Sequence, residues 1–461
     1  MAERPLRQRF EALRAREFSR LDESRHVYLD YTGSGLYSAS QLRNHEEYLR
    51  DRVFGNPHSE SPASATATEL VERARQEVLR FFNADPERYS VVFTANASAA
   101  LKLVGEAYPF DHRSRFVLLE DNHNSVQGIR LYAEARGAQV SFLGLDDRLR
   151  LAPDQTIPEP GAGPSLFAFP AQSNFSGVKH PLSLVTEARD RGFDVVLDAA
   201  AFVPTSSLDL DAVPADFTCV SFYKMLGFPT GVGALIARTE ALLRLRRPWF
   251  AGGTVEYVSV QGRTHRLRLG AEAFEDGTLN FLAIMAVPPG LAFLEDVGMH
   301  HINARVEELT RRLLGILEAL RHAGGSSAVE LYGPQTVESR GGTVAFNLLD
   351  SAGRVVPYGA VERAASHHNL SLRGGCFCNP GAAEAAFGLP AEESVRCFEG
   401  LPHGAFSLKD LADCLDHRYA VGALRASVGI ASNEADLDRL ETFLAQFLAD
   451  YTADPGRFAA D

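Results

Sequence analysis

The chain has 461 residues, of which 45% are hydrophobic and 23% are charged, and its net charge is −13. This composition is typical of a globular protein with two or three domains. The negative charge argues against nucleic acid or an anionic membrane as a main partner. No apolar run is long enough to span a bilayer, and the charged N-terminus has no apolar signal region. We therefore expect a cytoplasmic protein.

The five cysteines do not suggest a disulfide framework. Their number is odd, and Cys219, Cys397 and Cys414 are scattered along a long chain without an export signal. The exception is the pair Cys376 and Cys378. A single C-x-C without a second cysteine or histidine pair is weak evidence for a metal, so we predict no metal site.

The first segment reads as helices with one short strand between them. Helical patterns cover 5–20, 38–53 and 65–83, and Thr66 or Thr68 is a candidate cap for the third. The strand is expected at 26–31 and is followed by a turn at 32–35.

From residue 89 the hydrophobic pattern changes, and short apolar strands alternate with helical stretches. We predict strands at 90–94, 115–119, 139–143, 166–170, 195–198, 217–221 and 233–237. The helices among them are expected at 97–107, 125–136 and 181–191. This alternation predicts an α/β fold with a mainly parallel sheet and helices on both faces. Ligands bind at the carboxyl ends of such strands.

The last third predicts a smaller α+β region. Residues 241–280 look irregular, and helices are expected at 280–296, 300–323, 358–368 and 434–451. Strands are expected at 343–347, 371–374 and 423–428. We therefore divide the chain into an N-terminal arm (1–55), a large ligand-binding domain (56–297) and a small C-terminal domain (298–461).

Lys224 follows an apolar strand and is expected on a tight, glycine-rich turn. A desolvated lysine amine, or one near another cation, is neutral enough to form a Schiff base with a carbonyl. Pyridoxal phosphate (PLP) is the common carbonyl cofactor that needs such a lysine. Taken alone, Lys224 also fits a solvated surface residue.

Three further polar residues follow predicted strands. Asp198 ends a buried strand, where a carboxylate is costly unless it meets a cation such as a protonated pyridine nitrogen. His123 is placed to stack on a ring and move protons. The Asn174 amide is placed to donate to the ring hydroxyl. Each has a plainer reading as a cap or turn residue.

Small and hydroxyl residues at Thr94–Ala100 mark a helix N-terminus, where Ala97 and Ser98 suit an anion such as phosphate. A plain N-cap is the alternative. On a late strand, Arg425 suits a bidentate grip on a carboxylate or, alternatively, a salt bridge. Cys376 and Cys378 lie on a glycine-rich loop, where a cysteine near cations becomes nucleophilic and one elsewhere is inert.

Together these motifs resemble the class V, fold-type I PLP enzymes, the family of cysteine desulfurases. Within that family the chain is most similar to the N-terminal domain of molybdenum cofactor sulfurases. The resemblance spans about residues 25 to 445 and is carried by these segments: 54–59 (F-G-N-P-H-S), 93–95 (F-T-A), 170–179 (P-A-Q-S-N-F-S-G-V-K), 221–231 (S-F-Y-K-M-L-G-F-P-T-G), 274–278 (F-E-D-G-T) and 375–379 (G-C-F-C-N).

The resemblance implies roles for the residues at a PLP site. Lys224 matches the Schiff-base lysine, Asp198 the partner of the pyridine nitrogen and His123 the ring-stacking histidine. The residues that match the phosphate site are Ala97, Ser98 and Ser221. Thr278 matches a residue that reaches the phosphate of the neighbouring subunit, which implies a homodimer. The substrate-binding group is implied to comprise Arg425, Asn174 and Arg373.

Cys378 matches the cysteine that becomes a persulfide, although Cys376 stays open as the active thiol. The implied activity takes sulfur from L-cysteine, or a related sulfur amino acid, onto Cys378 and releases alanine, with a possible acceptor protein downstream. Tyr223 stands where many desulfurases have histidine, and Ala199–Ala201 replace a glutamine that bonds the ring oxygen. Ala382 and Ala383 stand where the sulfurases usually have a third cysteine.

Because the chain stops at residue 461, without the C-terminal domain of the longer sulfurases, we expect a free-standing sulfur donor. Two other readings stay open. One is a PLP-dependent C–S or β-eliminating lyase, or a class V aminotransferase or epimerase, that does not use Cys378. The other is a catalytically inactive PLP fold that serves as a scaffold.

Overall fold

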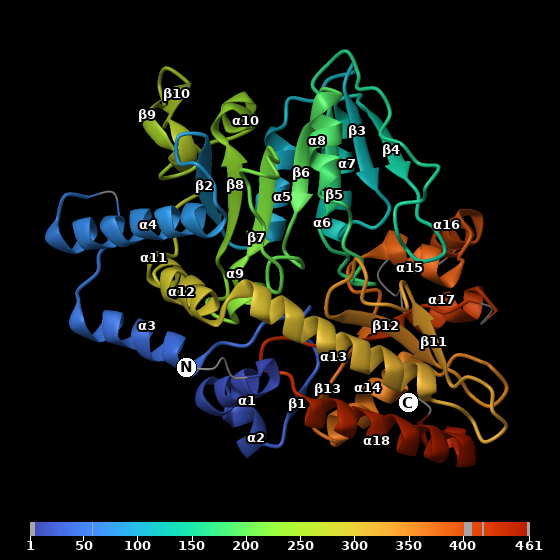
Figure 1. Ribbon diagram of the computed structural model, residues 1–461. Helices are drawn as coiled ribbons and strands as arrows, with labels where there is room; N and C mark the ends of the chain where they lie inside the picture. Colours follow the sequence, from blue (N-terminus) through green and yellow to red (C-terminus); the bar gives the residue numbers. More distant parts are fainter. Residues whose placement is uncertain (1–4, 58, 401–407, 417–418, 459–461) are drawn as a thin grey trace.

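The computed structural model describes residues 5–57, 59–400, 408–416 and 419–458. Its centre is a seven-stranded sheet (Figure 1). In spatial order the strands are β2 (Tyr89–Thr94), β8 (Gly233–Arg238), β7 (Phe217–Ser221), β6 (Asp194–Asp198), β5 (Leu166–Pro170), β3 (Arg115–Leu119) and β4 (Gln139–Leu143). Four of the six neighbouring pairs are parallel, and the two antiparallel pairs are those that β8 makes with β2 and β7. The predicted mainly parallel sheet is confirmed.

Two separate cores cover the two faces of this sheet. Successive residues of β3 alternate between them: Phe116 and Leu118 join one core, and Val117 and Leu119 join the other. This is the two-residue period of a strand buried on both faces. The first core is completed by helices α5 (Ala97–Ala107), α6 (Asn124–Gln127), α7 (Ile129–Ala135) and α10 (Thr239–Arg244). The second contains α4 (Pro62–Phe81), α8 (Ser183–Asp190), α11 (Phe281–Ile284) and α12 (Val287–Val297).

A second, four-stranded antiparallel sheet lies below and to the right in Figure 1. Its order is β11 (Val329–Tyr332), β12 (Thr343–Leu348), β15 (Ala423–Ser427) and β14 (Arg373–Gly375). Helices around it are α13 (Met299–Ala319), α14 (Tyr358–His367), α15 (Pro380–Phe387), α16 (Ala391–Gly400), α17 (Leu408–Cys414) and α18 (Glu434–Ala453), with the short helix η2 (Pro455–Phe458) after α18. The short strand β11 and helices α15 to α17 were not predicted.

The N-terminal segment lies against this second sheet. It contains α1 (Leu6–Glu17), α2 (Arg20–Glu23), β1 (Val27–Tyr28) and α3 (Ala39–Asp51). Strand β1 pairs in parallel with β13 (Leu370–Ser371), and Asp30 bridges to Ser427. The guanidinium of Arg14 is buried and bonds Asp436 of α18, with Nη1–Oδ2 at 2.6 Å. Asp30 is thereby brought beside β15.

Several local predictions are wrong. Helix α4 begins at Pro62, and Ser61 caps it instead of Thr66 or Thr68, whose hydroxyls bond back to carbonyls four residues earlier. The region predicted to be irregular contains α10, the hairpin β9 (Val255–Ser259) and β10 (Thr264–Leu267), and the short helix η1 (Gly270–Phe274). Every residue of these two strands is exposed or only partly buried, so the hairpin has no buried face whose alternation would indicate a strand.

Cys397 and Cys414 form a disulfide, contrary to the expectation from the cysteine count. The two cysteines are 17 residues apart on α16 and α17. The pairing depends on how these helices pack, and spacing alone does not reveal that. Cys219, Cys376 and Cys378 are free.

No single helix in the described ranges is long and apolar enough to cross a membrane. The segments 281–297 and Met299–Ala319 pass such a test only as a pair, bent by 69°. Apolar residues of both, including Leu291, Leu294 and Leu313, are buried in the core of the protein.

Candidate active site

The carboxyl ends of β5, β6 and β7 and the N-terminus of α5 surround a cavity that is partly open to solvent. We call it the strand-end cavity. It brings together seven predicted residues from segments up to 127 positions apart, which are Ala97, Ser98, His123, Asn174, Asp198, Ser221 and Lys224.

Lys224 lies on the short helix α9 (Phe222–Leu226), not on the predicted turn. The helix ends at Gly227, whose φ of +71° is left-handed. A side chain there would also meet the backbone of Leu36 and Tyr37, so glycine is required. The turn therefore ends the helix that carries the lysine.

The Lys224 amine donates to Asn174 Oδ1 at 2.9 Å. Burial lowers its pKa from 10.5 to about 8; Asp198 opposes this shift, and Arg425 adds to it. Weaker opposing contributions come from Cys378 and Asp30. The amine therefore has a substantial neutral fraction near neutral pH, as a carbonyl-binding lysine requires.

Asp198 is 8% exposed at the end of β6. Its Oδ1 accepts the backbone N–H of Ala200 at 3.1 Å, and its carboxylate faces the strand-end cavity without a cationic hydrogen-bond partner among the described residues. A buried carboxylate in this position suits a cationic ligand group.

His123 caps α6 and also lines the cavity, so the cap is confirmed and the stacking role stays a prediction. Its Nδ1 accepts the N–H of Ser125 at 3.1 Å, which leaves the proton of a neutral ring on Nε2. Burial lowers the pKa of His123, and Lys224 adds to this shift while Asp198 opposes it. The lowered pKa favours the neutral ring.

The N-terminus of α5 forms the opposite end of the cavity. The N–H of Ala97 donates to Ser221 Oγ at 2.8 Å, and the hydroxyls of Ser98 and Ser125 are 2.6 Å apart. This helix has eleven residues, and its positive end with neighbouring hydroxyls suits a phosphate. Thr278 lies elsewhere: it accepts a bond from Asn56 and does not line the cavity of its own chain.

The predicted substrate arginines lie on neighbouring strands and share one carboxylate. Arg425, on β15, is 1% exposed and donates to Asp30 Oδ1 at 3.0 Å and to the Asn174 carbonyl at 2.8 Å. Arg373, opposite it on β14, grips Asp30 with an Nη2–Oδ2 distance of 2.6 Å. Burial lowers the pKa of Arg425. Asp30, which sequence reasoning missed, thus connects the N-terminal segment to both arginines.

The two loop cysteines differ. Cys376 is partly buried, its thiol faces the carbonyl of Val421 at 3.6 Å, and burial raises its pKa to about 11. Cys378 is exposed. Asn174 links its loop to Lys224, because the same amide accepts from the lysine and donates from Nδ2 to the Phe377 carbonyl at 2.7 Å.

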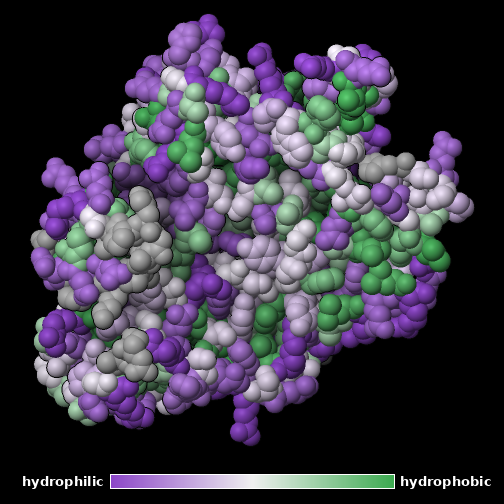
Figure 2. Space-filling model, turned by 180° about the vertical axis from the view of Figure 1, so that it is seen from behind, coloured by the Kyte–Doolittle hydropathy of each residue, from purple (hydrophilic) through white to green (hydrophobic). Residues whose placement is uncertain are grey.

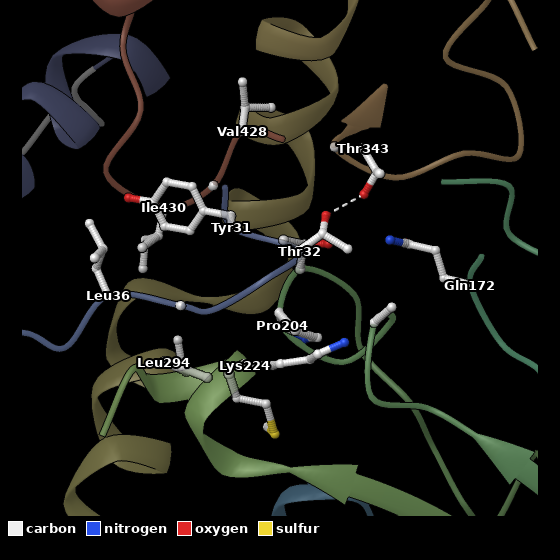
Figure 3. A pocket seen from close by; sticks show the side chains of 16 residues that line it. Tyr31, Thr32, Leu36, Gln172, Pro204, Lys224, Leu294, Thr343, Val428 and Ile430 are labelled. Atoms are coloured by element: carbon white, nitrogen blue, oxygen red, sulfur yellow. Dashed lines mark hydrogen bonds between the residues drawn. The ribbon is translucent and has the colours of Figure 1, made fainter. Parts of the chain in front are cut away.

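A second cavity lies on the other side of Lys224, between the N-terminal segment and β12 (Figure 3). Lys224 and Gln172 line both cavities. Gln172 points toward the middle of the second cavity, and its Oε1 is buried without a partner in the described residues. The hydroxyls of Thr32 and Thr343 bond each other across the wall. Gln172 lies in the 170–179 motif, but its position between the two cavities was not predicted.

The model of the family described as "Aminotransferase class-V" matches residues 27–440. The chain belongs to the class-V aminotransferase family. PLP is the cofactor of this family, and the residues of the strand-end cavity fit it: a buried amine for the carbonyl, a carboxylate without a cationic partner for the ring nitrogen and a helix N-terminus for the phosphate.

Named relatives agree with this family. The chain is 38% identical over 446 residues to molybdenum cofactor sulfurase 3 of Aedes aegypti, covering 92% of this chain and 56% of the relative. It is 37% identical over 462 residues to human molybdenum cofactor sulfurase, covering 95% and 51%. The chain thus spans about half the length of these curated relatives.

Among solved structures, the apo cysteine desulfurase of Thermococcus onnurineus NA1 superposes with a TM-score of 0.78 at 25% identity. The match covers 98% of this chain and all of that one. The predicted fold-type I architecture, with its seven-stranded sheet, is confirmed.

Proposed function

We propose that this protein is a PLP-dependent cysteine desulfurase that takes sulfur from L-cysteine, or a related sulfur amino acid, onto Cys378. The observation that carries the proposal is the position of the Cys378 loop. Asn174 binds Lys224 through Oδ1 and this loop through Nδ2, so an exposed thiol lies on a loop attached to the cofactor-binding amine.

The charges around the site favour this assignment. Cys378 lies within electrostatic range of two basic side chains, Lys224 and Arg425. Cys376 lacks this advantage, because its burial favours the protonated thiol. The structural neighbour named a cysteine desulfurase supports the same chemistry.

In the proposed reaction, PLP, when bound, withdraws electrons from the substrate carbons. The Cys378 thiolate attacks the substrate sulfur, so that an S–S bond forms, the C–S bond breaks and its electron pair stays with the carbon. Lys224 or His123 then delivers a proton to that carbon, and alanine leaves. Asp198 holds the positive charge of the ring nitrogen. Arg425, with Arg373 and Asn174, orients the substrate carboxylate.

The deciding experiment assays alanine, sulfide and pyruvate from L-cysteine with a thiol reductant, in the wild type, Cys378→Ala and Cys376→Ala. Alanine that is lost only in Cys378→Ala supports the proposal. Pyruvate and ammonia that survive both substitutions assign the protein to the eliminating lyases. Turnover of other amino acids alone, unaffected by either substitution, indicates an aminotransferase or epimerase. Bound PLP with no turnover of any amino acid indicates a scaffold.

The proposal includes a homodimer in which Thr278 completes the neighbouring site. In its own chain Thr278 lies outside the strand-end cavity. Seen from behind, hydrophobic residues gather on the right of the molecule (Figure 2), the side that carries α3, α4 and the β9–β10 hairpin. Exposed apolar side chains there include Leu49, Val53, Trp249, Val260 and Leu269. Such an area suits a subunit interface.

Mixed dimers of Lys224→Ala and Thr278→Ala chains test this arrangement. If Thr278 acts on the partner's cofactor, one of the two sites in a mixed dimer is fully wild type, and activity reappears on mixing. If Thr278 acts within its own chain, every site carries one substitution and activity stays at the level of the parents. A strictly monomeric wild type also contradicts the arrangement.

A further inference from the structure

The loop that carries Cys378 has an unfavourable backbone conformation. Phe377 and Cys378 both have left-handed φ angles, +54° and +56°. Two successive residues with side chains rarely adopt this region, because the β-carbon approaches the following carbonyl. Such a conformation persists only where the surroundings hold it, and these sites are often functional.

Three hydrogen bonds from the seven-stranded-sheet side hold this loop. The N–H of Asn124 donates to the Cys378 carbonyl, and Asn174 Nδ2 donates to the Phe377 carbonyl, both at 2.7 Å. The third runs from the loop: Asn379 Nδ2 donates to Asp121 Oδ1 at 2.7 Å. Asp121 and Asn124 flank His123, so the thiol is tied to the segment that lines the cofactor cavity.

The buried carboxylate of Asp121 anchors this loop. Its carboxylate is 0% exposed and also accepts from Ser173 Oγ at 2.7 Å, while His180 Nε2 lies 2.8 Å from its other oxygen. Three segments therefore converge on one buried carboxylate. Glycine at position 381 allows the start of α15 to pack against the backbone of Glu120. A β-carbon there would come within 2.3 Å of the Glu120 carbonyl oxygen.

Asn379 uses its side chain in an unusual way. It stands at the N-cap of α15, where an asparagine normally accepts a bond from its own helix, yet its side chain makes no capping bond. It is 1% exposed, and its amide N–H₂ points to Asp121 instead. The Asn379 side chain therefore bonds a residue 258 positions away in sequence instead of capping its own helix.

We propose that Asn379 is a positioning residue that holds Cys378 at the substrate by its bond to Asp121. The inference rests on the proposed desulfurase function. Thiolate attack on a bound sulfur requires accurate placement, and small displacements of a reacting group reduce rates sharply. Asn379 therefore acts on the rate of sulfur transfer, and it has no contact with the cofactor cavity.

The test compares Asn379→Ala with the wild type as PLP-loaded enzyme. We expect kcat for alanine formation to fall at least about tenfold, with KM within about twofold and the cofactor absorbance unchanged. Persulfide on Cys378, followed by mass spectrometry, should fall in parallel. Hydrogen exchange in peptides covering residues 373–388 should rise, because the loop is released. Asn83→Ala, which removes an asparagine–aspartate bond outside both cavities, should change none of these.

A double variant in which the two side chains are exchanged tests whether a loss of activity comes from the missing bond or from misfolding. Asn379→Asp places a second carboxyl beside Asp121 and should impair transfer as Asn379→Ala does. Adding Asp121→Asn to it restores one donor and one acceptor, and should recover much of the rate and of the exchange protection. Recovery supports the proposal, whereas wild-type transfer by Asn379→Asp overturns it.

The outcomes for the inference and for the proposed function are separate. If wild type forms no persulfide on Cys378, the desulfurase function fails, and hydrogen exchange still judges whether Asn379 holds the loop. If wild type forms the persulfide and Asn379→Ala does so at the same rate, with unchanged exchange, the positioning role is wrong.

Discussion

The residues that line the strand-end cavity and the loop that carries Cys378 are two sides of the candidate site, and they are held in different ways. On one side, Lys224, Asp198 and His123 follow the ends of buried strands, and their positions derive from a sheet with a core on each face. On the other, Cys378 lies on an exposed loop with left-handed residues, and hydrogen bonds from the first side hold it. The cofactor side is rigid by packing, and the thiol side is placed by a few polar contacts.

This difference suits the proposed chemistry. A cofactor must stay in one place through the reaction, whereas a persulfide has to meet the substrate and then an acceptor. A loop held by hydrogen bonds can be released more cheaply than a strand end, because no apolar core has to open. Substitutions on the two sides should therefore have different signatures, which the following predictions test.

The largest effect is expected on the rigid side. Lys224→Ala should reduce turnover about 1,000-fold or more and remove the visible absorbance of lysine-bound PLP, because the amine both holds the cofactor and moves protons. Absorption spectra and alanine assays measure this. Lys179→Ala is a matched control, since this lysine is also largely buried with a lowered pKa but lines neither cavity. Persistence of the absorbance in Lys224→Ala would identify a different anchor.

Asp198→Asn should reduce turnover about 100-fold while PLP stays bound. The amide cannot hold a positive charge on the ring nitrogen, so the ring withdraws electrons less strongly. Steady-state kinetics with spectra of the bound cofactor measure this. Asp216, a buried carboxyl outside both cavities whose pKa burial raises to about 6, provides the control Asp216→Asn. Equal losses in both variants would point to general destabilisation instead.

Capture of PLP by the cofactor-free protein should depend on pH through Lys224. Only the neutral amine reacts, so the rate should rise about tenfold per pH unit below pH 8 and level off above it. An ordinary lysine with a pKa of 10.5 is neutral in about 1 molecule in 3,000 at pH 7, against about 1 in 10 here. Stopped-flow absorbance measures this rate. A rise that continues to pH 10 would show that burial does not lower the pKa of Lys224.

The smallest effect is expected in the reactivity of the two loop cysteines, Cys378 and Cys376. At pH 7.5, iodoacetamide should label Cys378 at least about ten times faster than Cys376, because only about 1 in 3,000 molecules carries the Cys376 thiolate at a pKa of about 11. Cys219 is fully buried and should not react in the folded protein. Peptide mass spectrometry follows each site. Faster labelling of Cys376 would make it the candidate thiol.

Hydrophobic patterning was enough to predict the sheet and the residues at its strand ends. Apolar strands alternating with amphipathic helices specify a parallel sheet, and ligand-binding residues then follow strand ends such as Asp198 and precede helices such as α5. Lys224, Asp198 and His123 were identified in this way, and the structure brings them to one cavity.

The contacts that hold the Cys378 loop and the two arginines could not be predicted from the sequence. The bonds from Asp121 to Asn379 and from Asp30 to Arg425 join segments 258 and 395 positions apart, and no local pattern encodes such pairs. The disulfide between Cys397 and Cys414 likewise depends on how two helices pack. Hydrophobic periodicity specifies which face of an element is buried, whereas polar contacts between distant segments form only after the chain has folded and brought them together.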